Sequence, residues 1–204
     1  MSFFMKLVSM VFHPLLICTY LNTFLLYKAP ELLSRIKPQV QLQFLMVILL
    51  ITGLMPVFSI VILKTFKFIS NLELLKRSER IVPFIFILFY YCVASYLFME
   101  KLEMEFLFNT IMISATLLIF ILLLITIRFK ISIHSAAIWS AVGYITAIIM
   151  IQGINVDWIY YLLVTLAGLT ATSRLYLGYH TSKEVWGGTI LGFSYSLLVL
   201  LIFT

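Results

Sequence analysis

The run EFLFNTIMISATLLIFILLLITI at residues 105–127 carries no charge after Glu105. The hydrocarbon core of a bilayer is about 30 Å thick, and an α-helix needs about 20 consecutive apolar residues to cross it. The run is therefore long and apolar enough for one membrane crossing. Its apolar residues are continuous and do not alternate with polar ones, which favours a helix over a strand of a membrane barrel.

The rest of the chain repeats this pattern. Of its 204 residues, 63% are hydrophobic and 11% are charged, whereas soluble domains are about 45–50% apolar and about 25% charged. We predict an all-α, polytopic membrane bundle with six or seven spans, built as a single domain over residues 1–204 in an integral protein of the bacterial inner membrane. The candidate spans are residues 7–27, 41–63, 82–99, 105–127, 134–151, 157–172 and 185–203.

Three polar connections, residues 64–80, 128–132 and 173–184, are each separated from the next by two candidate spans. All three must then emerge on one membrane face, where their polar side chains can converge. That face and the N-terminus hold ten of the 14 Lys and Arg residues, which points to the cytoplasm. If four of the ten bind phosphate, the remaining six against four decide nothing, so the side of the site stays open.

The last connection has the sequence SRLYLGYHTSKE at residues 173–184. His180 and Glu184 are four residues apart, so on a helix they would share one face and could form a hydrogen bond. A carboxylate on an imidazole fixes its tautomer and raises its basicity, as a nucleophilic or general-base histidine requires. Arg174 offers a planar guanidinium suited to phosphate oxygens, and Gly178 permits a turn.

The other two connections carry further polar groups. Residues 130–135, KISIHS, supply Lys130, Ser132 and His134, and residues 76–83, KRSERIVP, supply Lys76 and Arg80. Two histidines among cations can divide a phosphoryl transfer, since one attacks phosphorus and the other protonates the leaving oxygen while the cations stabilise charge. The formal charge of +6 suits an anionic membrane surface or an anionic substrate. Because the basic residues are scattered through short loops, they do not indicate nucleic acid.

With these segments the chain resembles the type 2 phosphatidic acid phosphatase superfamily, which includes membrane lipid phosphatases. Ser173-Arg174, five residues, His180, three residues and Glu184 match that family's third motif, with Glu for Asp at the last position. Residues 131–134 match its second motif at Ser132 and His134 but lack the Pro and Gly. Lys76, Arg80 and Pro83 are loosely similar to the first motif, so the resemblance covers about residues 76–204, the expected phosphatase-like core.

The resemblance implies hydrolysis of a phosphate monoester or diphosphate on an isoprenyl lipid or glycerolipid, without metal or other cofactor. His180 would be the nucleophile that forms a phosphohistidine, Glu184 would orient it, and His134 would be the general acid. The expected phosphate ligands are Arg174, Lys76, Arg80 and Ser132, and Lys130 is a further candidate beside them. The expected partners are the lipid phosphate substrate and membrane lipids, with no nucleic acid.

Several alternatives remain open from the sequence. His180 with Glu184 could be a solvated ion pair, and the basic clusters could be headgroup anchors. His134, His180 and Glu184 are also zinc ligand types, although neighbouring Lys and Arg would repel a cation. Among functions, a non-catalytic relative that binds or transports phospholipid and a lipid phosphotransferase are the two alternatives to a phosphatase.

Overall fold

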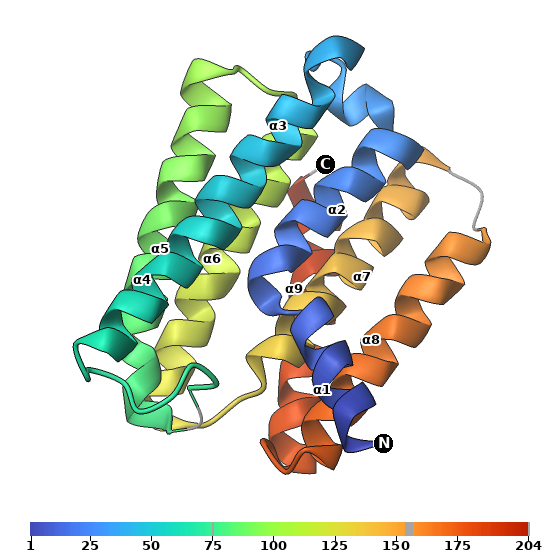
Figure 1. Cartoon of the computed structure of the whole chain (residues 1–204). Coiled ribbons are helices and arrows are strands. Elements are labelled where there is room, and N and C mark those ends of the chain that lie inside the picture. Colours follow the sequence, from blue (N-terminus) through green and yellow to red (C-terminus); the bar gives the residue numbers. More distant parts are fainter. Residues whose placement is uncertain (75, 154–156, 204) are drawn as a thin grey trace. The chain divides into compact units, whose positions relative to one another are not determined.

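The computed structural model describes residues 1–74, 76–153 and 157–203. Over these ranges the secondary structure is helical, without strands, which confirms the all-α prediction. The chain divides into two compact units (Figure 1): unit 1 combines Met1–Ile17 with Lys130–Thr204, and unit 2 is Cys18–Phe129. The single domain expected from the sequence therefore consists of two units, and the expected core of residues 76–204 is divided between them.

Unit 1 is built around two helices that pack along each other, α7 and α9 (Figure 1). Its elements are α1 (Ser2–Val11), the start of α2 (Pro14–Lys28), α7 (Ile133–Gln152), α8 (Trp158–Tyr176) and α9 (Ser182–Phe203). Helix α8 packs against α7, and α1 packs against α8. An apolar cluster of Ile17, Ile138, Ala141, Val142 and Ala167 holds this unit together.

Glycines set the spacing between α7 and α9. A methyl group on Gly188 would overlap the carbonyl oxygen of Ser132, and one on Gly192 would overlap that of Ala136. The two glycines are four residues apart on α9, the small-residue spacing that lets helices in membranes approach closely. The amide of Ser132 donates to the carbonyl oxygen of Glu184 at 3.0 Å. The segments that precede α7 and α9 therefore lie side by side.

Unit 2 contains the remaining helices. They are α2 from Cys18 onward, α3 (Gln41–Ile48), α4 (Met55–Thr65), α5 (Ile81–Tyr96) and α6 (Phe106–Arg128), with π-helical segments at Leu49–Leu54 and Leu97–Lys101 and 3-10 segments at Pro30–Leu33, Pro38–Val40 and Arg77–Arg80. The rings of Phe44, Phe98 and Phe108 pack with centroids 5.3 to 6.0 Å apart. Ser95 and Thr116 form a hydrogen bond of 2.9 Å between α5 and α6.

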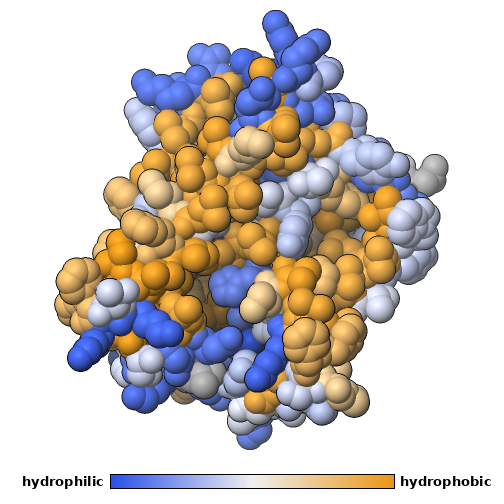
Figure 2. All heavy atoms as spheres, in the orientation of Figure 1, coloured by the Kyte–Doolittle hydropathy of each residue, from blue (hydrophilic) through white to orange (hydrophobic). Residues whose placement is uncertain are grey.

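Five helices of the described residues are long and apolar enough to cross a membrane: Pro38–Thr65, Arg77–Lys101, Phe106–Arg128, Ile133–Gln152 and Ser182–Phe203. A sixth results if α1 and α2 count as one broken span. These helices are compatible with an integral membrane protein. Figure 2 agrees, since apolar side chains cover the helices on the visible face and hydrophilic ones gather at helix ends and loops.

Two predicted spans differ from the structure. The first, 7–27, is not continuous, because α1 ends at Val11 and α2 starts at Pro14 with a bend of 61°. Proline has no N–H for the helical ladder and clashes with the preceding turn, which explains the break. The sixth, 157–172, forms the 19-residue α8, but α8 is not among the five, since hydroxyls and Arg174 lower its apolar character. The count of six or seven spans is thus not confirmed.

Candidate active site

The turn between α8 and α9 places Arg174 and Tyr179 together. Gly178 adopts the left-handed conformation, with φ of 67°, and its amide donates to the carbonyl of Leu175 at 3.0 Å. The amide of Tyr179 donates to the carbonyl of Arg174 at 3.2 Å, which completes a Schellman motif at the end of α8. The Tyr179 ring consequently lies against the Arg174 guanidinium, and the central guanidinium carbon is 4.6 Å from the ring centroid. The turn expected at Gly178 is present.

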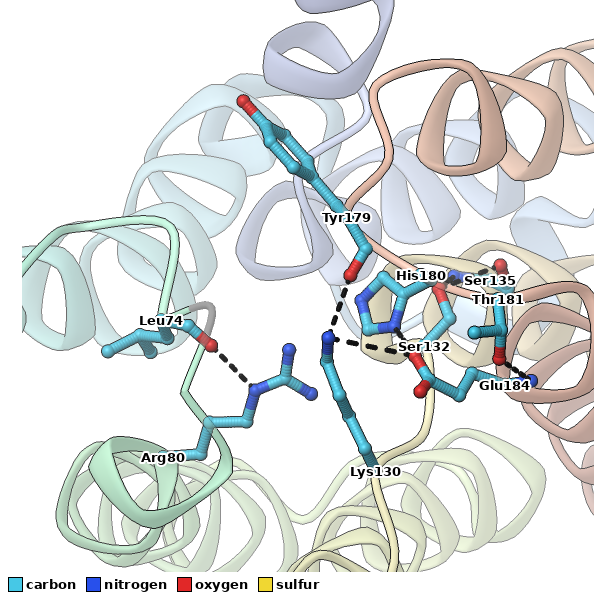
Figure 3. A network of polar contacts seen from close by, with 9 residues as sticks. All are labelled: Leu74, Arg80, Lys130, Ser132, Ser135, Tyr179, His180, Thr181 and Glu184. Atoms are coloured by element: carbon cyan, nitrogen blue, oxygen red, sulfur yellow. Dashed lines mark hydrogen bonds and ion pairs between the residues drawn. The ribbon is translucent and has the colours of Figure 1, made fainter.

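His180 and Glu184 form a close polar pair in the site. Nδ1 of His180 lies 2.7 Å from Oε2 of Glu184, and the two side chains are 2% and 18% exposed (Figure 3). The contact predicted from their spacing is present, but its expected basis, one shared helix face, is wrong. Helix α9 starts only at Ser182, and the amide of Glu184 donates to the Thr181 hydroxyl at 3.4 Å. Thr181 therefore caps the helix, and the Glu184 carboxylate reaches back beyond the cap to His180.

Lys130 joins the segment before α7 to the turn before α9. Its ammonium donates to the carbonyl of Tyr179 at 2.9 Å and lies 3.8 Å from Oε2 of Glu184 (Figure 3). The Glu184 carboxylate thus has an imidazole on one side and a cation near the other. A carboxylate oxygen in this position can accept a hydrogen bond from Nδ1 of His180.

Ser132 and His134 lie at the start of α7. The Ser132 hydroxyl accepts from the amide of Ser135 at 3.4 Å and lies 3.0 Å from its hydroxyl. Ser132 therefore caps α7, and its phosphate-binding role stays a prediction. His134 is in the first turn of α7, and its ring meets that of His13 edge to face, with centroids 5.2 Å apart and an interplanar angle of 82°.

Arg174 is the most deeply buried cation of unit 1, with 1% of its surface exposed. Its guanidinium donates to the hydroxyl of Ser9 on α1. A guanidinium keeps its charge at any accessible pH, so its positive field acts permanently on the neighbouring histidines. Arg174, His13 and His180 all act electrostatically on His134. The guanidinium and the imidazoles thus bring hydrogen-bond donors suited to an anion together in unit 1.

The two residues predicted from the first motif belong to unit 2. Arg80 is 2% exposed, and its Nε donates to the carbonyl of Leu74 at 2.7 Å. Lys76 is exposed and forms an ion pair of 3.2 Å with Glu79. Unit 1 therefore contains six of the eight predicted residues, and the phosphate-binding roles of Lys76 and Arg80 stay predictions from sequence.

Sequence reasoning missed Ser9, His13 and Tyr179. His13 had one visible signal, since an ionisable residue inside an apolar segment is often functional. Nothing in the sequence links Ser9 to Arg174, because the two meet only when α1 packs on α8. Tyr179 lies inside the third motif, but its contact with Arg174 requires the Schellman geometry.

No group of three or more His, Cys, Asp and Glu side chains within residues 1–74, 76–153 and 157–203 has the arrangement of a metal site. The zinc alternative therefore has no ligand set in these ranges. Comparisons with protein-family models, with curated proteins and with solved structures found no match.

Proposed function

We propose that this chain is a membrane lipid phosphatase that hydrolyses a phosphate monoester or diphosphate on an isoprenyl lipid or glycerolipid through a phosphohistidine. One observation carries the proposal: the His180–Glu184 contact of 2.7 Å, in the same compact unit as His134 and the buried Arg174. The resemblance to the type 2 phosphatidic acid phosphatases in residues 173–184 and 131–134 supports the same chemistry.

The first chemical step follows from this pair. Because Glu184 engages Nδ1 of His180, Nε2 is the nitrogen that attacks phosphorus. The P–N bond forms as the bond from phosphorus to the lipid oxygen breaks, and His134 gives the leaving oxygen its proton. Arg174 and Lys130 stabilise the charge on the equatorial oxygens. The starts of α7 and α9 add the positive ends of two helix dipoles.

The second step returns the enzyme to its starting state. A water molecule attacks the phosphohistidine, and neutral His134 takes one of its protons. The P–N bond breaks, inorganic phosphate leaves, and Nε2 regains its lone pair. Each turnover thus consumes one water and releases one phosphate and one lipid alcohol or lipid monophosphate. The proton that His134 gives to the leaving oxygen is replaced by the one it takes from the water.

The proposal includes seven membrane spans, with α8 as the sixth. The support comes from unit 1 itself, since the starts of α7 and α9 are side by side and their glycine contacts keep them parallel. The chain between them must then return over the same distance, and the 19 residues of α8 extend about 28 Å as a helix. The site at the helix ends lets a lipid tail stay in the bilayer, and the proposed location is the bacterial inner membrane.

The test is phosphate release by the detergent-purified protein from a panel of isoprenyl and glycerolipid phosphates and diphosphates, with a chelator present. We expect release that His180→Ala lowers by about 10³-fold or more, as losses of nucleophilic residues do. Lys183→Ala, on the exposed side of the same helix turn, is the matched control and should keep full activity. Acid-labile labelling of the native protein by a ³²P substrate, absent in His180→Ala, would identify the phosphohistidine.

The panel also separates the alternatives. A folded protein that binds lipid phosphate but releases none would be the non-catalytic relative and would end the phosphatase proposal. Transfer of phosphate to added acceptor alcohols, with little free phosphate, would make it a phosphotransferase that uses the same His180.

A further inference from the structure

The N-terminal segment reaches the candidate site, although it belongs to none of the three connections from which the site was predicted. Ser9 lies near the end of α1 and is 7% exposed, and its hydroxyl accepts from the Arg174 guanidinium. The backbone of Ser9 also lies near enough to the His134 imidazole to act on it electrostatically. Ser9 thus contacts Arg174 of the third motif and lies near His134 of the second.

His13 is held in a defined orientation at the break between α1 and α2. It directly precedes Pro14, the first residue of α2, and its Nδ1 accepts from the amide of Leu15 at 3.4 Å. Its carbonyl oxygen accepts from the amide of Leu16 at 2.9 Å. Because Nδ1 is an acceptor, the neutral ring carries its proton on Nε2. The His13 ring therefore caps the start of α2, and this hydrogen bond fixes its orientation where it meets the His134 ring edge to face.

An imidazole at the start of a helix can rotate, and rotation would move the proton away from the oxygen that must receive it. Proton transfer requires heavy atoms about 2.6–3.2 Å apart. The His13 ring, whose centroid is 5.2 Å from that of His134, limits this rotation from the N-terminal side. The Ser9 hydroxyl limits the movement of Arg174 in the same way.

We infer that the segment from Ser9 to His13 is a working part of the site: His13 positions the ring of His134 for proton transfer, and Ser9 positions the Arg174 guanidinium for phosphate. Both are positioning residues, because they act through His134 and Arg174. The inference rests on the proposed function and adds to it a fourth segment that no motif contains.

Two substitutions at His13 separate its ring from its capping role. Asparagine is among the best capping residues, so His13→Asn keeps the cap of α2 and removes the ring. Phenylalanine keeps an aromatic edge against His134 and removes the cap. We expect His13→Asn to lower the rate with an alkyl phosphate by about 10- to 100-fold, because a poor leaving group needs the general acid. The pre-steady-state burst of nitrophenol from a nitrophenyl phosphate, which reports only the first step and whose leaving group needs no proton, should keep its rate. His13→Phe should keep more activity than His13→Asn.

A purely structural role predicts the opposite. His13→Asn would then match the native protein, His13→Phe would be defective, and both substrates would respond equally. That pattern would overturn the inference for His13.

Ser9 is tested by the hydroxyl it contributes. Ser9→Ala should raise KM for the lipid phosphate about tenfold with a smaller change in kcat, the loss expected for one charged hydrogen bond. Ser9→Thr keeps the hydroxyl and should restore KM, and Ser2→Ala, at the exposed start of the same helix, is the matched control. An unchanged KM in Ser9→Ala, or a failure of Ser9→Thr to restore it, would contradict the role.

A readout without turnover keeps the inference testable if the protein releases no phosphate. The chain has 3 histidines, so ¹⁵N-histidine NMR resolves each ring once His134→Asn and His180→Asn have assigned the signals. His13→Asn should shift the His134 ring nitrogens and leave those of His180 in place. If the protein releases no phosphate, only the proposed function is contradicted. Unchanged His134 signals in His13→Asn would contradict the inference about the N-terminal segment.

Discussion

Glu184 joins more of the site than any other single residue. Its carboxylate contacts Nδ1 of His180 at 2.7 Å and lies 3.8 Å from the Lys130 ammonium. Its amide and carbonyl bind Thr181 and Ser132. The side chain thus orients the nucleophile, while the backbone fixes the start of α9 against the start of α7.

A substitution that removes the charge of Glu184 but keeps the shape of its side chain tests this role. Glu184→Gln should lower kcat for lipid phosphate hydrolysis by about 10²-fold or more, because a neutral amide neither fixes the same tautomer nor stabilises the imidazolium. Glu184→Asp keeps the charge with an arm one methylene shorter and should lose less. Glu103→Gln, which removes an exposed carboxylate of unit 2, is the control and should be neutral. Equal activity of Glu184→Gln and the native protein would show that the contact is only structural.

Lys130 is the cation that joins the segment before α7 to the turn before α9. Its ammonium binds the carbonyl of Tyr179 at 2.9 Å, so Lys130→Met leaves that carbonyl without its cation. We expect a loss of about 1–2 kcal/mol of stability, the usual size for a partly exposed charged hydrogen bond. The measurement is thermal unfolding in detergent, with Lys183→Met as the control at an exposed position of the same turn. Equal unfolding temperatures for the two variants would refute the bridging role.

At the scale of the elements, the contact between α7 and α9 sets the geometry of the site. Gly188 and Gly192 face carbonyl oxygens of Ser132 and Ala136 so closely that a methyl group cannot fit, whereas a methyl on the neighbouring Gly187 would meet only the Ile131 side chain, at 3.9 Å. Adjacent glycines of one helix therefore have opposite tolerance.

The neighbouring glycines of α9 should respond differently to replacement by alanine. Gly188→Ala and Gly192→Ala should lower the unfolding temperature and the activity together, because α7 must move and carries His134 with it. Gly187→Ala should be tolerated or stabilise by about 0.5–1 kcal/mol, since alanine is the better helix former. Loss of activity in Gly187→Ala equal to that in Gly188→Ala would contradict the packing argument.

Much of this element-scale structure follows from the sequence. Continuous apolar runs predict helices, and the separation of the connections by pairs of spans predicts that the starts of α7 and α9 share one membrane face. In unit 1 these two starts lie side by side. The break at Pro14 could have been predicted, because proline ends the preceding helix. The position of His180 outside α9 could not, since the choice of Thr181 as cap over an earlier helix start depends on the whole turn.

At the scale of the whole molecule, the limits of the sequence lie in contacts between distant segments. Residues 173–184 predict the pairing of His180 with Glu184 because the two are local. The contacts of Ser9 with Arg174 and of His13 with His134 join residues more than 100 positions apart and depend on side-chain packing. The division into two units is likewise invisible in a composition that is apolar throughout.

The number of spans depends on whether α8 crosses the membrane. If α7 and α9 are parallel spans, the two ends of α8 lie on opposite membrane faces. Trp158 and Tyr176, both exposed at those ends, are suitable sites for single cysteines in a background with Cys18→Ala and Cys92→Ala. In sealed vesicles, a membrane-impermeant maleimide should label one of Trp158→Cys and Tyr176→Cys directly and the other only after permeabilisation. Lys183→Cys, just inside α9, should follow Tyr176→Cys, because one short turn joins them. Labelling of both ends of α8 from the same side would mean that α8 does not cross, and the parallel arrangement of α7 and α9 would then require one of those two helices to be re-entrant.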